Sequence, residues 1–149
     1  MTYRRPKLYP KQEQAIFSNN RYAVIEGSTK SGKTVACLTW LLEQAILGKD
    51  GNSFWWVAPV YGQAKMAFRR MKRGLPKNIY TNNESELTIT LPNGAIIAFK
   101  SGEKADNLYG DDVYGAVIDE ATRVREESWH AIRSTLTATR GAVRIIGNV

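Results

Sequence analysis

The fold of this protein is decided by one stretch of its sequence, Gly27-Ser28-Thr29-Lys30-Ser31-Gly32-Lys33-Thr34. The stretch fits the pattern G-x-x-x-x-G-K-[ST], whose glycines let successive backbone N–H groups converge on phosphate oxygens. The positive end of a helix that follows such a loop adds to this attraction. We expect all eight residues to contact a nucleotide, with the Lys33 ammonium at the β- and γ-phosphates and the Thr34 hydroxyl on Mg²⁺.

The sequence on either side supplies the strand and the helix that such a loop needs. Residues 21–26 form a short, largely apolar run bounded by Gly27, which predicts a buried strand. Apolar residues then recur at helical spacing as far as Gly48, a typical helix stop: Val35, Leu38, Leu42, Ala45 and Ile46. The alternative, a glycine- and lysine-rich surface turn without a ligand, does not account for these flanking elements.

The composition is that of one globular domain. The 149 residues are 43% hydrophobic and 23% charged, which allows a single core. A formal net charge of +7 favours a polyanionic partner, although nucleotide phosphates use part of that charge. Cys37 and His130 are the only residues of their types, and we expect a buried thiol and a helix-surface imidazole. The sequence shows neither a membrane span nor a signal peptide, so we expect an intracellular protein.

A second chemical motif lies about 85 residues after Lys33. The run Tyr114-Gly115-Ala116-Val117-Ile118 predicts a small apolar strand, and it ends in two acids, Asp119 and Glu120. In this Walker B arrangement the first acid holds the water shell of Mg²⁺ and the second is the general base for water. Neighbouring side chains on a strand point in different directions, which suits two separate tasks. The alternative, acids that cap a helix beginning near Glu126, does not explain the apolar run before them.

The segment between the two motifs predicts a core strand and a basic helix. Residues 53–58 are aromatic and β-branched, and Trp55 and Trp56 favour packing within the sheet over a base-stacking platform. Residues 61–73 predict a helix with an apolar side formed by Ala64, Ala67, Phe68 and Met71. Its other side is the densest positive patch of the chain: Lys65, Arg69, Arg70, Lys72 and Arg73. A solvated face and a DNA-facing surface both remain open.

A hairpin follows the basic helix. Residues 86–91 and 95–100 have strand character and flank Pro92-Asn93-Gly94, and Asn-Gly between such runs is a strong hairpin signal. The hairpin would extend a central parallel sheet at one edge. Residues 101–114 are polar and predict an exposed loop.

The last part of the sequence predicts a helix over 128–139 and an apolar strand over 142–146. Gly147 and Asn148 follow that strand directly. A small residue and a polar amide at this place suit the sensing of a γ-phosphate.

The N-terminal segment carries a hypothesis about the nucleotide base. Residues 1–10 are basic and proline-punctuated, which predicts a flexible arm, and residues 10–17 look like a short helix with proline near its start. Tyr9-Pro10-Lys11-Gln12 resembles the adenine-reading element of helicase-like motors, in which a glutamine amide pairs with the adenine edge and an aromatic ring stacks on its face. By that resemblance Gln12 and Tyr9 contact adenine, and the alternative is an ordinary helix start.

Together these motifs resemble the ATPase domain of the large terminase subunit, the motor that packages DNA in tailed bacteriophages. The two Walker motifs alone specify a P-loop NTPase, whereas Gly147-Asn148 and the segment 107–110 favour terminase. The implied fold is a RecA-like α/β P-loop NTPase of the additional-strand, catalytic-glutamate type, with a mainly parallel sheet flanked by helices and an inserted hairpin. The resemblance covers nearly the whole chain and rests mainly on five segments: Tyr9–Gln12, Gly27–Thr34, Trp56–Pro59, Val117–Ala121 and Ile145–Asn148.

The resemblance implies Mg²⁺-dependent ATP hydrolysis that drives double-stranded DNA into a procapsid. Lys33 and Glu120 would be catalytic, and Thr34 and Asp119 would hold the metal. Gly147 and Asn148 would form the motif that couples hydrolysis to DNA movement. The implied partners are double-stranded DNA, the portal protein, the small terminase subunit and further copies of the chain in a ring. The basic helix would face DNA or the portal, in the host cell cytoplasm and transiently at the procapsid.

Two departures from the family pattern limit this transfer. Many terminases carry Leu-Arg-Gly shortly before Walker B, and that arginine is a candidate for completing a neighbouring subunit's site, but Tyr109 occupies the position here. Four possible substitutes remain open: Lys104, Arg123, Arg125 and Arg140. Large terminases also continue into an RNase H-like nuclease domain. We interpret residues 1–149 as the ATPase domain alone, with the arm and adenine-reading element in 1–20 and a P-loop core without its last strand in 21–149.

Three other functions stay open. Asp119-Glu120-Ala121-Thr122 also satisfies the DExx box of a superfamily 2 helicase, although Gly147-Asn148 favours terminase. A non-catalytic nucleic-acid-binding assembly module would use the basic helix beside a vestigial loop, but the intact Walker residues argue against decay. A small-molecule kinase is disfavoured because no lid-like segment is visible and Glu120 suits the activation of water.

Overall fold

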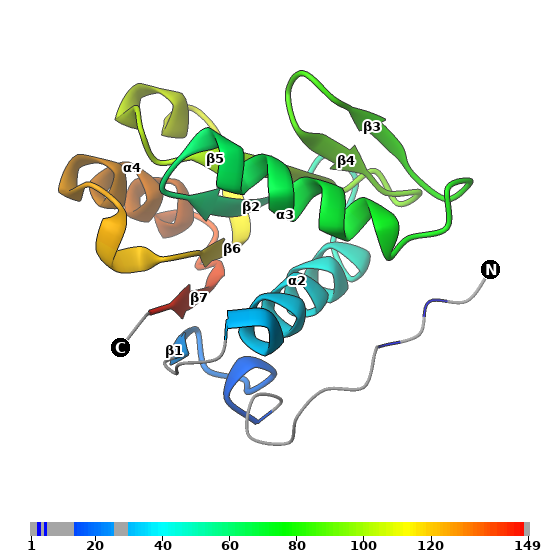
Figure 1. The fold of residues 1–149 in the computed structure, drawn as a ribbon, viewed down its shortest axis with the longest axis horizontal. Helices are drawn as coiled ribbons and strands as arrows, with labels where there is room; N and C mark the ends of the chain where they lie inside the picture. The colour runs from blue at the N-terminus through cyan, green and yellow to red at the C-terminus, as the bar shows by residue number, and fades with distance from the viewer. Residues whose placement is uncertain (1–2, 4, 6–13, 26–29, 148–149) are drawn as a thin grey trace.

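A computed structural model describes residues 3, 5, 14–25 and 30–147 of the chain. These residues form one seven-stranded sheet in the order β1-β7-β6-β2-β5-β4-β3 (Figure 1). The strands are β1 Tyr22–Ile25, β2 Ser53–Ala58, β3 Thr81–Asn83, β4 Thr88–Thr90, β5 Ile96–Ser101, β6 Val113–Ile118 and β7 Ala142–Ile146. The α-helices are α2 Lys30–Ile46, α3 Tyr61–Arg73 and α4 Glu126–Thr137, and two 3₁₀ helices are η1 Ala105–Leu108 and η2 Ala121–Arg123.

The sheet is parallel in its centre and antiparallel at one edge. Strands β1, β7, β6, β2 and β5 run parallel to one another. The predicted hairpin is confirmed, because β4 pairs antiparallel with β5. Its turn residue Gly94 has φ +87°, and a Cβ there would overlap the carboxylate of Asp50, so the turn requires glycine. Strand β3, which pairs with β4, is missing from the sequence prediction because Thr81, Asn82 and Asn83 are polar and exposed.

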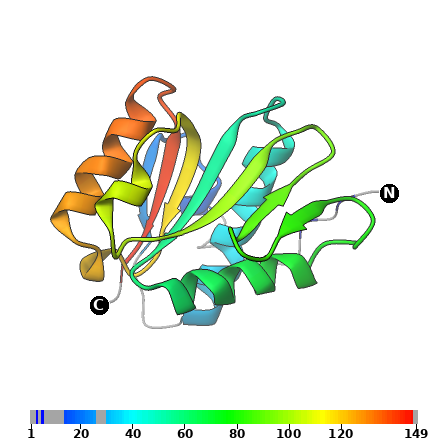
Figure 2. The same ribbon diagram turned by 90° about the horizontal axis from the view of Figure 1, so that it is seen from above.

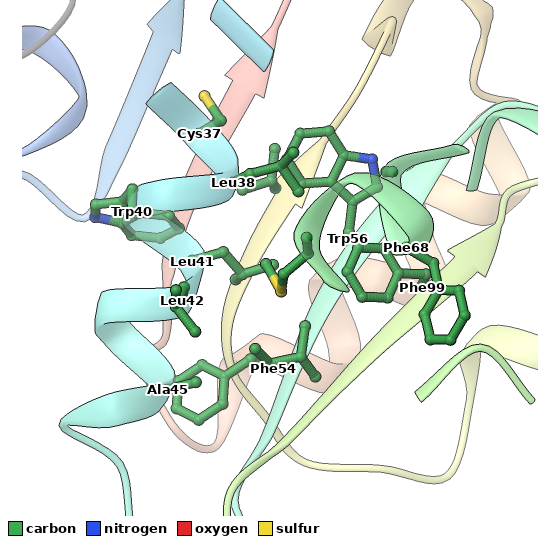
Figure 3. Packing of buried hydrophobic residues seen from close by; sticks show 14 of the residues in the cluster. Cys37, Leu38, Trp40, Leu41, Leu42, Ala45, Phe54, Trp56, Phe68 and Phe99 are labelled. Atoms are coloured by element: carbon green, nitrogen blue, oxygen red, sulfur yellow. The ribbon is translucent and has the colours of Figure 1, made fainter. Parts of the chain in front are cut away.

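Helices α2 and α3 cover one face of the sheet, and α4 covers the other (Figures 1 and 2). Successive residues of β2 point to opposite faces, so Trp56 packs with α2 and α3 while Trp55 packs with α4. The two tryptophans are 0% and 1% exposed, which confirms that they pack in the core. Figure 3 shows Leu41 and Leu42 of α2 beside Phe54 of β2 in the larger of the two apolar clusters.

The single cysteine and the single histidine lie where the sequence predicts them. Cys37 is buried on α2, and burial raises the pKa of its thiol to about 12. His130 lies on α4, and its side chain is 64% exposed. Both fit structural rather than chemical roles.

The hairpin turn caps the C-terminal end of α2. Asn93 Nδ2 donates to the carbonyls of Ala45, Ile46 and Gly48 at 2.9, 3.0 and 3.1 Å. The last carbonyls of a helix have no hydrogen-bond donors within the helix, and the Asn93 side chain provides a donor for them. The edge hairpin therefore holds the far end of the helix whose first turns carry Lys33.

Arg144 on β7 ties the segment before β1 to the sheet. The side chain is 1% exposed and donates to the carbonyls of Ile16, Ser18 and Asn20 at 2.6, 2.9 and 3.0 Å. Its guanidinium carbon lies 4.6 Å from the ring centre of Trp40. Burial lowers the pKa of Arg144. The sequence indicates only an apolar strand here and does not predict this anchor.

Several predictions of local structure are wrong. The strand predicted as buried over 21–26 is the edge strand β1, in which Tyr22 and Val24 are both 57% exposed. Segment 101–114 is not a simple exposed loop, because it contains η1 with the fully buried Leu108 and its last two residues belong to β6. Helix α4 begins at Glu126, two residues before its predicted start. The acidic side chains of Glu126 and Glu127 lie in its first turn, where they interact favourably with the positive end of the helix dipole. Among the described residues, no helix is long and apolar enough to cross a membrane.

Candidate nucleotide-binding site

A cleft of about 810 Å³ lies at the carboxyl edge of the parallel strands. Lys33 and Thr34 line it from the start of α2, and Asp119 and Glu120 line it from the turn after β6. Ile146, the last residue of β7, lies between these two sources in the strand order. Carboxyl ends of parallel strands meet at one edge of a sheet, which is where α/β proteins bind ligands. The residues of the two sequence motifs therefore share one cleft.

Lys33 connects the phosphate loop with the end of β7. Its side chain is 3% exposed, and its Nζ donates to the carbonyl of Gly147 at 3.1 Å. The backbone N–H of Gly147 donates to the carbonyl of Ile25 at 3.0 Å, which continues the pairing of β1 with β7. The lysine predicted to bind phosphate and the glycine predicted to couple hydrolysis to movement are thus in direct contact.

Asp119 and Thr34 offer oxygen ligands to a cation. The backbone N–H of Asp119 donates to the carbonyl of Val57 at 2.8 Å, so the aspartate continues the pairing of β6 with β2. Its carboxylate and the Thr34 hydroxyl are the donor types that suit Mg²⁺, which is usually held by one or two carboxylates, waters and substrate phosphates. Within the described ranges no group of three or more His, Cys, Asp or Glu side chains could hold a metal ion. One carboxylate and one hydroxyl supply only part of a Mg²⁺ coordination shell, so Asp119 and Thr34 fit a cation whose other ligands are phosphate and water.

Glu120 is held in an unusual conformation just after the strand. Its backbone is left-handed, with φ 45° and ψ 55°, and a conformation of that kind costs a non-glycine residue about 1–3 kcal/mol. Two donors meet its Oε2 atom: Gln63 Nε2 at 2.6 Å and a guanidinium N–H of Arg123 at 3.1 Å. The sequence predicts that alternation along a strand orients Glu120. Because β6 ends at Ile118, the turn and these donors orient it instead.

The sequence predicts neither of these two contacts with Glu120. Gln63 follows the end of β2 closely, but that signal becomes useful only when β2 is known to lie beside β6. Arg123 is one of the open substitutes for an arginine acting in trans. In the structure it pairs with Glu120 of its own chain.

The basic side of α3 faces the same cleft. The helix has its predicted bounds, and its predicted apolar side is buried. Lys65 is the one member of the predicted patch that does not line the cleft, and Lys72 pairs with Glu84. The cleft is lined from this side by five cations: Arg69, Arg70, Lys72, Arg73 and Lys77.

Several predicted site residues lie outside the described part of the chain: Tyr9, Gln12, Gly27, Ser28, Thr29 and Asn148. Lys30 and Ser31 are described only as backbone in the first turn of α2, and Gly32 follows them. Tyr109 is 54% exposed. The remaining candidates for a trans-acting cation, Lys104, Arg125 and Arg140, are also exposed.

The strand order, the helices on both faces and the cleft at the carboxyl edge define a RecA-like α/β domain. Within that class, the family described as "Terminase large subunit, T4likevirus-type, N-terminal" matches residues 24–145. The chain belongs to this family.

Solved structures of large terminases have the same fold. The chain is similar to a mutant large terminase ATPase domain of Thermus phage P74-26, with 22% identity and a TM-score of 0.78 over 95% of this chain and 65% of that one. It is similar to the HK97 bacteriophage large terminase, with 21% identity and a TM-score of 0.80 over 96% of this chain and 33% of that one.

A third similar structure is the large terminase of a thermophilic bacteriophage in complex with ATP-γ-S, with 16% identity and a TM-score of 0.75 over 95% of this chain and 38% of that one. At these identities the likeness concerns the fold alone. The chain spans 65% or less of the length of these three structures. No curated protein matches the chain.

Proposed function

We propose that this chain is the ATP-hydrolysing domain of a large terminase subunit and that hydrolysis drives double-stranded DNA into a procapsid. The observation that carries the proposal is the meeting of Lys33, Thr34, Asp119 and Glu120 in one cleft. Family membership supports it, and so does the ATP analogue named with one structure of the same fold. The domain would comprise residues 1–149, with an arm in residues 1–20 and the P-loop core in 21–149.

In the proposed reaction, the Lys33 ammonium and the N–H groups of residues 27–34 hold the phosphates. Glu120 orients a water molecule and accepts one of its protons. The water oxygen forms a bond to the γ-phosphorus while the bond from that phosphorus to the bridging oxygen breaks. The electron pair of the broken bond leaves with ADP, and the products are ADP and inorganic phosphate.

Thr34 and Asp119 are the proposed protein ligands of Mg²⁺. The bound ion would neutralise charge on the phosphate oxygens as the reaction proceeds. We assign recognition of adenine to Gln12 and Tyr9. We assign coupling to Gly147 and Asn148, a role supported by the contact of Gly147 with Lys33.

The basic residues of α3 are the proposed surface for DNA or the portal: Lys65, Arg69, Arg70, Lys72 and Arg73. A net charge of +7 and the cluster of cations along one cleft support a polyanionic partner. The motor would also engage the small terminase subunit and further copies of itself in a ring. It would act in the host cell cytoplasm and transiently at the procapsid portal.

The test is ATP turnover by wild type and by Glu120→Ala, each alone and with procapsid portals, linear duplex DNA or single-stranded DNA. We expect duplex DNA and portals to stimulate wild-type turnover. Turnover stimulated by single strands together with duplex unwinding would replace the packaging motor with a helicase. Salt-sensitive DNA binding without any Glu120-dependent turnover would leave a binding module.

A further inference from the structure

We infer that Gln63 is a positioning residue for the hydrolysis of ATP, because its side chain holds the proposed general base in place. The inference rests on the function proposed for Glu120. Gln63 Nε2 donates to Oε2 of Glu120 at 2.6 Å, and both residues line the cleft that contains Lys33 and Thr34. An ionised carboxylate only accepts hydrogen bonds, so the amide must present its NH₂ group to Glu120.

The other end of the same amide explains why this contact points to function. Gln63 Oε1 is buried, and no donor within the described residues lies within hydrogen-bonding distance of it. A buried acceptor without a donor destabilises the folded protein, so most buried polar groups in proteins have partners. Stability alone therefore does not explain a glutamine at this position. What the side chain provides is a neutral donor to Glu120, which orients the carboxylate without placing a further positive charge on it.

The position of Gln63 is fixed by its helix. It is the third residue of α3, and Ala64 and Phe68 of that helix are fully buried against the sheet. The first backbone N–H of α3, that of Tyr61, is bound by the carboxylate of Glu103 at 2.7 Å. A side chain anchored in this way can hold Glu120 in its left-handed turn after β6. In the hydrolysis step the proton of the attacking water passes to Glu120, and Gln63 neither gains nor loses a proton.

The experiment compares Gln63→Met and Gln63→Glu with wild type in the intact protein. Methionine keeps the length of the side chain and removes both polar atoms, whereas glutamate places a second carboxylate beside Glu120. We expect kcat to fall at least about tenfold in both variants, with ATP affinity within about twofold of wild type, because misplacing a reacting group costs up to about a hundredfold in rate. Affinity for ADP–aluminium fluoride, which imitates the phosphoryl group under attack, should fall in parallel with kcat.

Melting temperature separates this role from a structural one. Gln63→Met removes the hydrogen bond to Glu120 and also a buried acceptor without a donor, and these two effects on stability oppose each other. Its melting temperature should therefore stay close to that of wild type while turnover falls. Gly62→Ala is the matched control, because a Cβ at the neighbouring position meets nothing within 4 Å. This control should keep wild-type turnover.

Two results would overturn the inference. Wild-type kcat and aluminium fluoride affinity in Gln63→Met would show that Glu120 needs no support from α3. A loss of turnover accompanied by an equal loss of ATP affinity and a lower melting temperature would make Gln63 a packing residue. Failure of the proposed function itself looks different, since wild type would then hydrolyse ATP no faster than Glu120→Ala.

Discussion

At the scale of single residues, three charged residues are unusual. Two of them are almost completely buried, and the third has a left-handed backbone. Lys33 is 3% exposed and bound to Gly147, and Glu120 sits in a left-handed turn between two donors. Arg144 is 1% exposed and bound to backbone carbonyls. Burying charge or straining backbone costs free energy, so such residues persist where neighbouring groups fix them. Lys33 and Glu120 lie in the cleft, whereas Arg144 supports the strand that leads to it.

Arg144→Lys should lower the free energy of unfolding by about 2–3 kcal/mol, because each buried carbonyl left without a donor costs about 1–3 kcal/mol. The guanidinium has five N–H donors in a planar fork, and the ammonium of lysine cannot reach the same set of carbonyls. Denaturation in urea measures the change. Arg133→Lys, at an exposed position on α4, is the matched control and should stay within about 0.5 kcal/mol of wild type. Equal effects in the two variants would show that the carbonyl contacts of Arg144 contribute little.

At the scale of elements, the sequence predicts the helices and strands that have a clear pattern of apolar residues. Strand β2 and helix α3 have their predicted bounds, since β2 is a continuous apolar run and α3 has one clear apolar side. Trp55 and Trp56 belong to the apolar run of β2, and both are buried as predicted. Strand β3 has no such pattern, because it is polar on both faces and depends on pairing with β4.

The residues of the candidate site also differ in how far the sequence predicts them. Lys33, Thr34, Asp119 and Glu120 belong to motifs with a fixed order of residues, so the sequence alone names them as candidates, and they line one cleft. The contact of Gln63 with Glu120 depends on which strands are neighbours, and local periodicity does not contain the order β6-β2. The left-handed turn at Glu120 is likewise set by packing after β6 has ended.

A pH-dependent contact secures the start of α3. Glu103 Oε1 accepts hydrogen bonds from the backbone N–H of Tyr61 at 2.7 Å and from the Ser101 hydroxyl at 3.0 Å. The bond from Tyr61, and then that from Ser101, lowers the pKa of Glu103. A carboxyl whose pKa is lower in the folded state stabilises the fold above its unfolded pKa, and this contribution disappears as pH falls through the folded value.

Glu103→Gln should therefore lower the melting temperature at pH 7, and the difference from wild type should vanish in acid. The effect should be small because the carboxylate is exposed to solvent. Thermal unfolding monitored by circular dichroism, from pH 7 down to acid pH, measures the difference in melting temperature. Glu86→Gln, at an exposed position before β4, should show no such pH-dependent difference. A Glu103 effect of the same size at every pH would mean that the ionised carboxylate is not the stabilising species.

At the scale of the whole molecule, positive charge gathers on the side of the cleft that α3 provides. If this side contacts DNA phosphates, the double variant Arg69→Gln/Arg73→Gln should bind duplex DNA more weakly. The slope of log K against log salt concentration should fall by about one for each phosphate contact that is lost. Titration of labelled duplex at several salt concentrations measures both quantities.

The control for this prediction removes the same charge elsewhere. Lys49→Gln/Arg133→Gln changes two exposed cations, one beyond the C-terminal end of α2 and one on α4, on the other face of the sheet. It should leave the salt slope close to that of wild type. Equal losses in the two double variants would assign DNA binding to net charge alone and not to α3.

Single-turnover hydrolysis by Glu120→Gln tests whether the cleft hydrolyses ATP with Glu120 as the proposed general base. The exchange removes the base while preserving the shape of the side chain, and Glu126→Gln, whose wild-type side chain is 91% exposed, is the matched control. We predict ATP affinity within about threefold of wild type and a hydrolysis rate at least about a hundredfold lower, the usual contribution of a general base. The control should hydrolyse ATP at the wild-type rate. Hydrolysis by Glu120→Gln at the wild-type rate would show that Glu120 is not the general base.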